Sequence, residues 1–421
     1  MNDAILRSQY EAYPYPARNP RDEATRLVTG SPSHRDEINH YLFAGRLDLT
    51  QPLRILVAGG GTGDGLVMLA QQFHNSNTPA DITYLDLSEA AQALALARIE
   101  ARGLGQGPER ITFLQGSLLE APQRFAEAPP FDYIDCCGVL HHLDDPASGL
   151  DALVAVLAPR GGIGLMVYAP GGRSGLYPLQ AALRELAPET EPAETRIALA
   201  RRVLKQLPPT HAFARNPFLS DHLLSDAGLY DLLLHSRDRS FTVPELAMLA
   251  ENAGLAITSL IEPARYDPRS WFSDPKLIPR LDRLNPLERA TLAENLLGHH
   301  SKHILYLTRP ENAATAVARL DDPNAIPILK DGINGPAVAR TLKPGSPLDA
   351  DLDGLAVRLP LPRLAGPILS RIDGHTSVQN LFQALAEARI VNDFNSFATQ
   401  FAQFAHTLQA INMLWMRNPP G

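Results

Sequence analysis

The sequence predicts an α/β fold built on a doubly wound, Rossmann-like sheet. Between residues 51 and 170, short apolar runs typical of strands alternate with patterns typical of helices, and this alternation indicates parallel βαβ units. A glycine cluster follows the first apolar run, at the position where such sheets bind ligands. The chain has 421 residues, 45% of them hydrophobic, which suits two or three globular domains of roughly 100–200 residues each.

The first strand is expected over Leu53–Ala58 and ends at the glycines, and a helix over Leu66–Phe73 follows it. Ser88 is suited to cap a helix that begins at Glu89 and ends at Gly103. The other strands are expected at 81–86, 111–114, 131–137 and 163–168, and 256–261 and 303–308 could complete a seven-stranded sheet.

Five segments are predicted along the chain. No strand is expected after Pro310, where a stretch rich in Pro, Gly and Asp leads to a helical end. The segments are an N-terminal arm or lid, 1–50; a ligand-binding core, 51–170; a helical, substrate-shaping insertion, 171–240; the completion of the sheet, 241–310; and a C-terminal module, 311–421.

The C-terminal module is expected to be mainly helical. Ile368–Val378 and the helices after it resemble small winged-helix modules, which raises DNA regulation as one role. The region from residue 321 holds nine acids and eight bases, and the helix over 394–414 carries no Lys or Arg to neutralise phosphates. A peptide-binding or homodimerising module is therefore favoured. The apolar stripe of that helix, predicted to face a core, is Phe394, Phe397, Phe401, Phe404, Leu408 and Ile411.

Charge and cysteine usage exclude several classes of protein. The 38 basic and 46 acidic residues give a formal net charge of −8, which disfavours general nucleic-acid binding. Cys136 and Cys137 are adjacent, so neither a disulfide framework nor a four-ligand zinc site can be drawn from them. With reduced thiols, no apolar leader and no apolar run of about 18 residues, we expect a cytoplasmic protein without a membrane partner.

The glycine cluster is the most informative motif. Gly59, Gly61 and Gly63 allow the backbone to approach a ligand closely. The dinucleotide fingerprint Gly-x-Gly-x-x-Gly fails, because its sixth position is Asp64 or Leu66 in the two available registers. An NAD-dependent oxidoreductase is therefore only a remote alternative, and the pattern that remains is Gly-x-Gly-x-Gly.

That pattern resembles the first motif of the class I S-adenosylmethionine-dependent methyltransferases. Four further elements of the family follow in order: Asp86; Gly116–Leu119; Phe131–Tyr133 with Leu140–Leu143; and Leu157–Gly162. A later passage, made of 218–222 and 230–244, resembles bacterial members with regulatory or tetratricopeptide-associated regions, among them rickettsial protein lysine methyltransferases. The resemblance implies a seven-stranded sheet and S-adenosyl-L-methionine as the cofactor.

The same resemblance implies which residues hold the cofactor. Asp86 would accept hydrogen bonds from the ribose hydroxyls, although it could instead serve only the helix that Ser88 caps, and Ser117 would accept from the adenine. The expected cofactor residues are Gly59, Gly61, Gly63, Asp86, Leu87, Ser117, Leu118, Cys137 and Gly138.

Candidates for the methyl-acceptor side come from three segments. His141 follows the fourth strand and could act as a general base, or it could only orient its loop. The strip 10–16, held extended by two prolines, could form an aromatic lid or pack elsewhere as an arm. Residues 237–239 are either surface ion pairs or substrate contacts. The expected lid and substrate residues are Tyr10, Tyr13, Tyr15, His142, His235 and Arg237.

No metal site is expected, since Asp145, beside Asp144, is explained as the cap of a helix that begins with Pro146. The predicted function is methyl transfer by in-line displacement to a protein side chain or a small molecule, which requires alignment and exclusion of water. The alternative is a non-catalytic regulator or interaction protein that binds S-adenosylmethionine and works through the C-terminal module.

Overall fold

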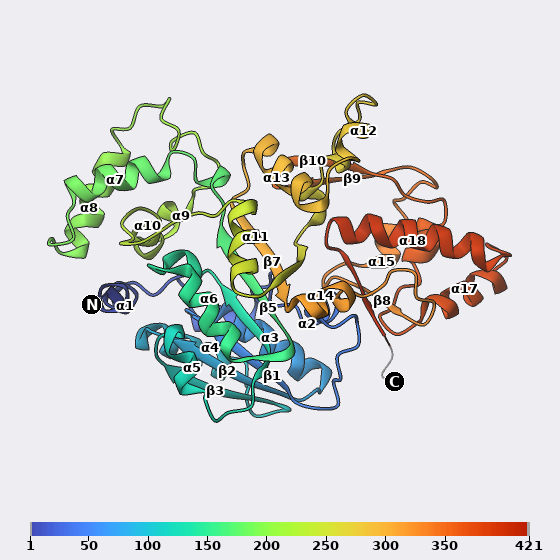
Figure 1. Ribbon diagram of the computed structural model, residues 1–421, viewed down its shortest axis with the longest axis horizontal. Helices are drawn as coiled ribbons and strands as arrows, with labels where there is room; N and C mark the ends of the chain where they lie inside the picture. The colour runs from blue at the N-terminus through green and yellow to red at the C-terminus, as the bar shows by residue number, and fades with distance from the viewer. Residues whose placement is uncertain (1, 419–421) are drawn as a thin grey trace. The chain divides into compact units, whose positions relative to one another are not determined.

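The computed structural model describes residues 2–418, which form two compact units (Figure 1). Unit 1 comprises the residues up to His34, Leu49–Gly254 and Gly298–Ile304. Unit 2 comprises Arg35–Asp48, Leu255–Leu297 and the residues from Leu305 onward. Each unit is therefore assembled from segments that lie far apart in the sequence.

A seven-stranded sheet with the order β3-β2-β1-β4-β5-β7-β6 confirms the predicted α/β fold. β1 pairs in parallel with β2 and β4, β2 with β3, and β4 with β5, whereas β6 runs antiparallel to β7. Each strand overlaps its predicted span. The strands are β1 Leu53–Ala58, β2 Ala80–Asp86, β3 Glu109–Gln115, β4 Phe131–Cys137, β5 Leu157–Tyr168, β6 Ala256–Leu260 and β7 Lys302–Thr308.

The parallel strands bring their carboxyl ends to one edge of the sheet. β1 ends at Ala58, β2 at Asp86 and β4 at Cys137, and the strand order reverses between β1 and β4. Open α/β sheets bind ligands in the crevice at such a reversal. The glycine loop and the segments that follow β2 and β4 are therefore neighbours at the expected binding edge.

Four helices of unit 1, α4, α6, α10 and α11, begin at residues whose side chains cap them. The Ser88 hydroxyl accepts a hydrogen bond from the Ala91 N–H at 3.0 Å, and Asp145 accepts one from the Ala147 N–H at 3.1 Å, which confirms its predicted role as a cap. The helices are α1 Asn2–Ala12, α3 Asp64–Ser76, α4 Glu89–Ala101, α5 Ala121–Arg124, α6 Pro146–Ala155, α7 Leu176–Leu186, α8 Ala193–Leu204, α9 Asp221–Leu224, α10 Asp226–Leu233 and α11 Val243–Asn252, with 3₁₀ turns η1 Pro20–Ala24, η2 Leu118–Glu120, η3 Leu140–His142 and η4 Gly171–Arg173.

The aromatic strip is not extended throughout, contrary to the prediction. Tyr10 lies in the last turn of α1, and the Tyr13 N–H still donates to the Gln9 carbonyl at 2.9 Å. A proline lacks an N–H and disfavours helix at the residue before it, here Tyr13, so Pro14 permits a helix that ends at residue 12. The strip therefore begins in the last turn of α1 and continues without helical structure through Pro14 and Pro16.

Unit 2 carries a core beneath α18. Phe397, Phe401 and Phe404 of the predicted stripe are fully buried in it. An N-terminal helix, α2 Arg35–Leu42, belongs to this unit, and the His40 Nδ1 accepts the Met416 N–H at 3.0 Å. The other helices are α12 Ile278–Leu281, α13 Pro286–Leu297, α14 Pro310–Ala316, α15 Gly335–Ala339, α16 Ala365–Leu369, α17 Val378–Glu387 and α18 Phe394–Ala410, with 3₁₀ turns η5 Pro263–Tyr266 and η6 Pro268–Ser270.

The expectation that no strand follows Pro310 is wrong. Two small antiparallel sheets form in this part of the chain, β9 with β10 and β8 with β11. Single short strands of four or five residues give weak sequence signals, and β8 and β11 become visible only through pairing across most of the module. The helical end is confirmed, and the winged-helix assignment stays a prediction. The strands are β8 Ile326–Leu329, β9 Leu348–Leu352, β10 Leu355–Leu359 and β11 Leu414–Arg417.

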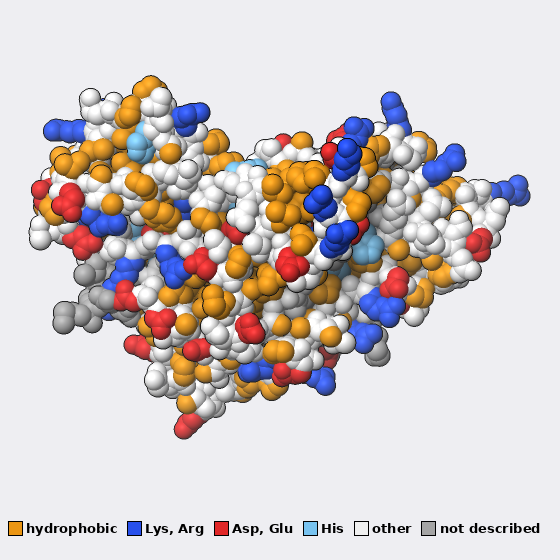
Figure 2. All heavy atoms as spheres, turned by 45° about the horizontal axis from the view of Figure 1, so that its top comes forward, with side chains coloured by type: hydrophobic (Ala, Val, Ile, Leu, Met, Phe, Trp, Pro, Cys, Tyr) orange, Lys and Arg blue, Asp and Glu red, His pale blue; other side chains and the backbone are white. Residues whose placement is uncertain are grey.

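Basic and acidic side chains are interspersed over most of the face drawn in Figure 2. Among residues 2–418, no helix is both long enough and apolar enough to cross a membrane.

Asp135 is a buried acid within β4. Only 1% of its surface is exposed, and its carboxylate accepts a hydrogen bond from the Ser33 hydroxyl at 2.6 Å. Burial raises the pKa of Asp135 to about 6, although the Ser33 hydrogen bond opposes the rise. The folded protein therefore holds this proton more tightly than the unfolded chain does.

We expect the free energy of unfolding to decrease as the pH rises from about 4 to about 6, because Asp135 must then ionise in an apolar site. The change should be at most about 3 kcal/mol, since one pKa unit corresponds to about 1.4 kcal/mol. Urea denaturation of wild type and Asp135→Asn at several pH values measures it. Equal pH dependence in the two proteins would show that Asp135 is not responsible.

Candidate functional site

The glycine loop after β1 adopts a backbone that only glycine accommodates easily. Gly59, Gly61 and Gly63 have φ values of +69°, +51° and +96°, in the region that other residues rarely enter. A Cβ atom at Gly59 would also lie 2.5 Å from the Val139 side chain, and one at Gly63 would lie 2.8 Å from the Ala95 Cβ. The loop therefore leaves its backbone uncovered at the binding edge of the sheet.

Asp86 links this loop to the start of α4. Its carboxylate accepts the backbone N–H groups of Gly61 and Ser88, each at 2.8 Å. Each carboxylate oxygen has a second lone pair, so the side chain can still accept hydrogen bonds from two hydroxyl groups. This acceptor set fits the ribose of S-adenosylmethionine. Burial raises the pKa of Asp86, although the backbone hydrogen bonds oppose the rise.

The other predicted cofactor residues lie in the segments that follow β2, β3 and β4. The Ser117 hydroxyl accepts the Leu119 N–H at 3.3 Å and so caps η2, and Leu118 is buried beside it. The Cys137 side chain is exposed at the end of β4, and the Gly138 N–H donates to the Met166 carbonyl at 3.0 Å. The strand order therefore brings the predicted set to one edge, on consecutive loops.

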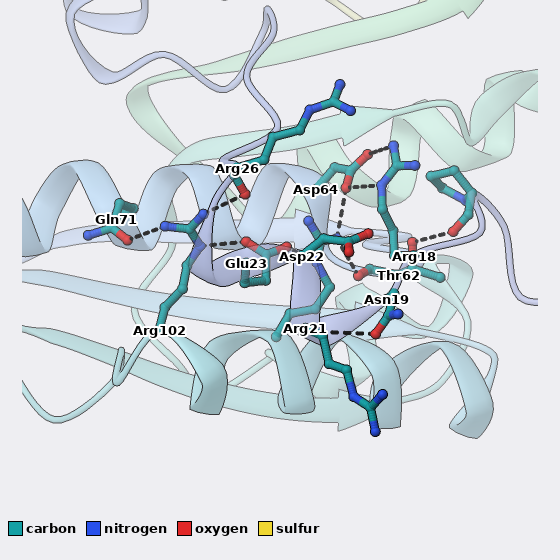
Figure 3. Close-up of polar contacts among 12 residues, drawn as sticks. Arg18, Asn19, Arg21, Asp22, Glu23, Arg26, Thr62, Asp64, Gln71 and Arg102 are labelled. Atoms are coloured by element: carbon teal, nitrogen blue, oxygen red, sulfur yellow. Dashed lines mark hydrogen bonds and ion pairs between the residues drawn. The ribbon is translucent and has the colours of Figure 1, made fainter.

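The segment from Pro16 to Arg26 is fastened to the glycine loop and to α3 and α4 (Figure 3). The Thr62 hydroxyl donates to the Pro16 carbonyl at 2.8 Å. Arg18 donates two hydrogen bonds to the Asp64 carboxylate, at 2.8 and 2.6 Å. Although burial opposes it, Arg18 holds the pKa of Asp64 below its usual value.

Glu23 extends the same network through Arg98 of α4 and Arg102, the residue that directly follows α4. Arg98 donates to Glu23 at 2.6 Å and to Asp64 at 2.7 Å, and Arg102 donates to Glu23 at 2.5 Å. Arg98 is fully buried, and it also donates to the Thr62 carbonyl at 2.8 Å. This cluster ties the N-terminal segment to the residues that follow the motif glycines.

Two predicted lid tyrosines contact different parts of unit 1. The Tyr13 ring stacks on Tyr230 of the insertion, with ring centroids 5.2 Å apart. The Tyr15 carbonyl oxygen lies 3.1 Å from where a Cβ atom on Gly61 would be. The strip therefore spans from the insertion to the glycine loop, and its action as a lid stays a prediction.

Tyr10 connects two residues of the insertion. Its hydroxyl lies 3.3 Å from the Asp231 carboxylate and 3.1 Å from Nε2 of His235. Nδ1 of His235 accepts the Arg237 N–H at 2.9 Å, so the proton of a neutral His235 ring sits on Nε2. The resulting chain of hydrogen bonds runs from His235 to Tyr10 and from Tyr10 to Asp231.

Asp231 is the residue of this cluster that sequence reasoning missed. Only 5% of its surface is exposed. Burial and the nearby charge of Asp238 raise the pKa of Asp231 to about 7, against the influence of Arg173 and Tyr10. The available signal was a single acid inside an otherwise apolar run, 229–234. A carboxyl group with a pKa near neutrality can accept and release protons under physiological conditions.

Ligand atoms of His142, Asp231 and His235 all lie within 4.8 Å of one another, as in some metal sites. The two imidazole rings, however, are stacked with centroids 4.0 Å apart and planes 18° apart. An imidazole binds a metal through a lone pair in its ring plane, so two nearly parallel rings cannot both direct a lone pair at one ion. Nε2 of His235 also carries a proton. The arrangement therefore fits a hydrogen-bonded cluster.

His141 and His142, which follow β4, are both buried. The His141 ring lies 3.8 Å from the Tyr168 ring, and neither of its nitrogens has a hydrogen-bond partner. Burial and neighbouring cations hold the pKa of His141 well below its usual value, so the ring is neutral at pH 7. His142 donates through Nδ1 to the Arg237 carbonyl at 2.9 Å, and it thereby positions the insertion.

Residues 237–239 differ from simple surface ion pairs. Arg237 pairs with Asp144 at 2.7 Å, and only Arg239 forms a largely exposed pair, with Glu245. The Asp238 side chain is fully buried and pairs with Arg173, whose guanidinium lies 3.6 Å from the centroid of the Tyr168 ring. The surface interpretation is therefore wrong for Asp238, because the insertion folds this residue inward.

Comparisons with known proteins agree with this fold. Residues 56–163 match the family model described as a methyltransferase domain. An uncharacterized protein of Synechococcus sp. is 32% identical over 296 residues, which span 68% of this chain and 67% of that protein. The solved structure of PKMT2 from Rickettsia typhi is 16% identical with a TM-score of 0.59, and its complex with AdoHcy is 14% identical with a TM-score of 0.61. Both alignments cover 94% of this chain and 77% of PKMT2, and they show the shared fold. The glycine loop, the acid at the end of β2, the strand order and these matches together show that the chain carries a methyltransferase domain over residues 56–163, within a Rossmann-like methyltransferase fold.

Proposed function

We propose that the protein transfers a methyl group from S-adenosylmethionine to an amine on a protein side chain. The observation that carries this proposal is Asp231, a buried carboxyl with a pKa of about 7 that accepts a hydrogen bond from Tyr10. An aliphatic amine is protonated at neutral pH and has no free lone pair. A base that works near neutrality is therefore useful for an amine acceptor in particular.

The charges around Asp231 also favour a cationic acceptor. Asp221 and Asp238 are near enough to influence its titration, and Arg173 is the cation that acts on it. Arg173 is itself paired with Asp238, so the acids outnumber the cation. An ammonium group would be attracted to such a site, and the aromatic ring of Tyr10 could add a cation–π contact.

In the proposed reaction, Asp231 acts as the base and Tyr10 orients it. The acceptor ammonium loses its proton to the Asp231 carboxylate. The bound cofactor would supply an electrophilic methyl carbon on sulfur, and the nitrogen lone pair would attack that carbon in line. The carbon–sulfur bond would break with its electron pair going to sulfur, which would leave S-adenosylhomocysteine and a methylated ammonium group. Burial raises the pKa of Tyr10 well above its usual value, so Tyr10 stays protonated and orients Asp231.

Two observations support a protein as the acceptor. The passage 230–244, which contains Asp231 and His235, resembles that of rickettsial protein lysine methyltransferases. Leu223 and Leu224 of α9, next to Asp221, are 74% and 78% exposed. These two adjacent leucines offer apolar contact area for a polypeptide acceptor beside the acidic site.

The test is incubation of the purified enzyme with a bacterial lysate and S-adenosylmethionine labelled in its methyl group. We expect label in protein that survives mild base and appears as methylated lysine after complete hydrolysis. Label released by base would indicate carboxyl methylation, and label confined to small molecules would exclude a protein acceptor. Either result would contradict the proposal.

Asp86→Asn provides the matching test of the cofactor site. Hydrogen bonds to a charged group contribute about 1.5–3 kcal/mol, so we expect calorimetry to show S-adenosylmethionine affinity reduced roughly 10–100-fold. Asp151→Asn, at an exposed position of α6, is the matched control and should bind as wild type does. Unchanged affinity in Asp86→Asn would remove Asp86 from the cofactor site.

A further inference from the structure

Unit 2 contains a groove of about 270 Å³ that no part of the proposed methyltransferase reaction uses. Residues of α15 and α16 and of the loops that follow and precede them line it. The two helices pack closely, since a Cβ atom at Gly335 would lie 2.5 Å from the Leu369 carbonyl oxygen. The walls of the groove are therefore held by helix packing and by several prolines.

The charge of the groove is of one sign. Arg340, Lys343 and Arg363 line it and are exposed, and the lining contains no acid. Within residues 2–418, these three cations form no ion pair, whereas Asp349 and Asp353 of the nearby hairpin sequence pair with Arg358 and Arg265. From residue 321 on the chain has eight bases and nine acids, and three of those bases line this groove with no acid in the lining.

The surface between the cations is apolar. Leu342 and Ala365 contribute side chains, and Pro336, Pro362 and Pro367 complete the lining. A ligand that fits must carry negative groups for the cations and small apolar groups for the surface between them. A long nucleic-acid backbone fits less well, because α18, the longest helix of the module, carries no Lys or Arg to extend phosphate contacts.

We propose that this groove binds an acidic peptide segment of a partner protein, in which carboxylate side chains alternate with small apolar ones. Three unpaired cations and no acid give the charge complementarity, and the leucine and prolines give the apolar contact. Because exposed ion pairs are individually weak and screened by salt, the affinity should be modest and salt-dependent. The proposal does not depend on which amine is methylated.

The test uses the full-length protein and a fluorescein-labelled twelve-residue peptide in which Glu alternates with Ala. Fluorescence anisotropy should show binding that weakens at least fivefold when salt is raised from low to physiological levels. A second peptide with Gln in place of Glu should bind at least tenfold more weakly. Equal binding of the two peptides, or no binding of the Glu peptide at low salt, would overturn the proposal.

A triple variant locates the site. Arg340→Glu, Lys343→Glu and Arg363→Glu together should reduce peptide affinity at least tenfold while the thermal melting curve is unchanged. The matched control changes three exposed cations elsewhere in unit 2, Lys276, Arg280 and Arg283, to Glu, and it should bind within about twofold of wild type. Equal losses in both variants would indicate a general charge effect and contradict the assignment. A single-stranded DNA twelve-mer that binds more tightly than the peptide, and through the same three residues, would assign the groove to nucleic acid instead.

Discussion

Asp231→Asn is expected to lower the single-turnover rate of methyl transfer by roughly 10²–10⁴-fold, the usual contribution of a positioned general base. The amide cannot take the proton of an acceptor ammonium, although it keeps the shape of the carboxyl group and can still contact Tyr10. S-adenosylmethionine binding should be unchanged, because Asp231 lies in the insertion and not on the loops that follow β1 to β4. Rapid quench with labelled cofactor measures the rate.

The pH profile separates this role from a structural one. Asp231 acts as a base only when ionised, so the wild-type rate should rise with pH and level off above about 7, the pKa that burial gives this group. In Asp231→Asn, the rising limb should move towards the pKa of a free amine, near 10.4. Asp226→Asn, at an exposed residue of the same helix, is the control. If the rate of Asp231→Asn at pH 7 is within threefold of the wild-type rate, Asp231 is not the base.

The sequence predicted the sheet and its binding edge because both depend on local patterns. Apolar runs, a glycine cluster and caps such as Ser88 act over a few residues, and the strand order follows from the right-handed connections of a parallel sheet. The small sheets of unit 2 could not be predicted in the same way. β8 and β11 are four residues each and pair across 85–91 positions of the chain, so no local pattern distinguishes them from loops.

The site shows the same division. Gly59 and Asp86 could be predicted because they belong to sequence motifs of the family. Asp231 can be recognised as a candidate only in the structure, because Tyr10 of α1, which lies beside it, is 221 positions away in the chain. Burial also gives His141 properties that the sequence does not show. His141 has two unpartnered ring nitrogens and a pKa well below its usual value, so it is neutral in the pH range where Asp231 titrates. These facts come from tertiary packing, which one sequence does not contain.

The N-terminal segment is held in place by a buried arginine, Arg98 of α4. Arg98 has no exposed surface, and its guanidinium contacts Glu23, Asp64 and the Thr62 carbonyl. Thr62 lies between two of the motif glycines and Asp64 follows the last of them, whereas Glu23 belongs to η1. The arginine therefore joins the N-terminal segment to the cofactor loop, and a change at Arg98 should affect stability and cofactor binding together.

Arg98→Met is expected to lower the free energy of unfolding by about 3 kcal/mol. Methionine fills much of the space, but two carboxylates then lose a buried cation, and breaking a buried pair by removing one partner typically costs 3–5 kcal/mol. Arg102 still pairs with Glu23 and Arg18 with Asp64, so we expect a loss of stability at the lower end of this range. Urea denaturation measures the loss.

The matched control is Arg7→Met, whose pair with Glu89 is about half exposed on both sides and should contribute no more than about 1 kcal/mol. Because Arg98 holds the N-terminal segment against the cofactor loop, hydrogen exchange in residues 16–26 should accelerate in Arg98→Met and not in Arg7→Met. S-adenosylmethionine affinity should fall in parallel. A destabilised Arg98→Met with unchanged exchange in that segment would mean that the ion network supports α4 alone, and that the segment is held over the glycine loop by other contacts such as Thr62 with Pro16.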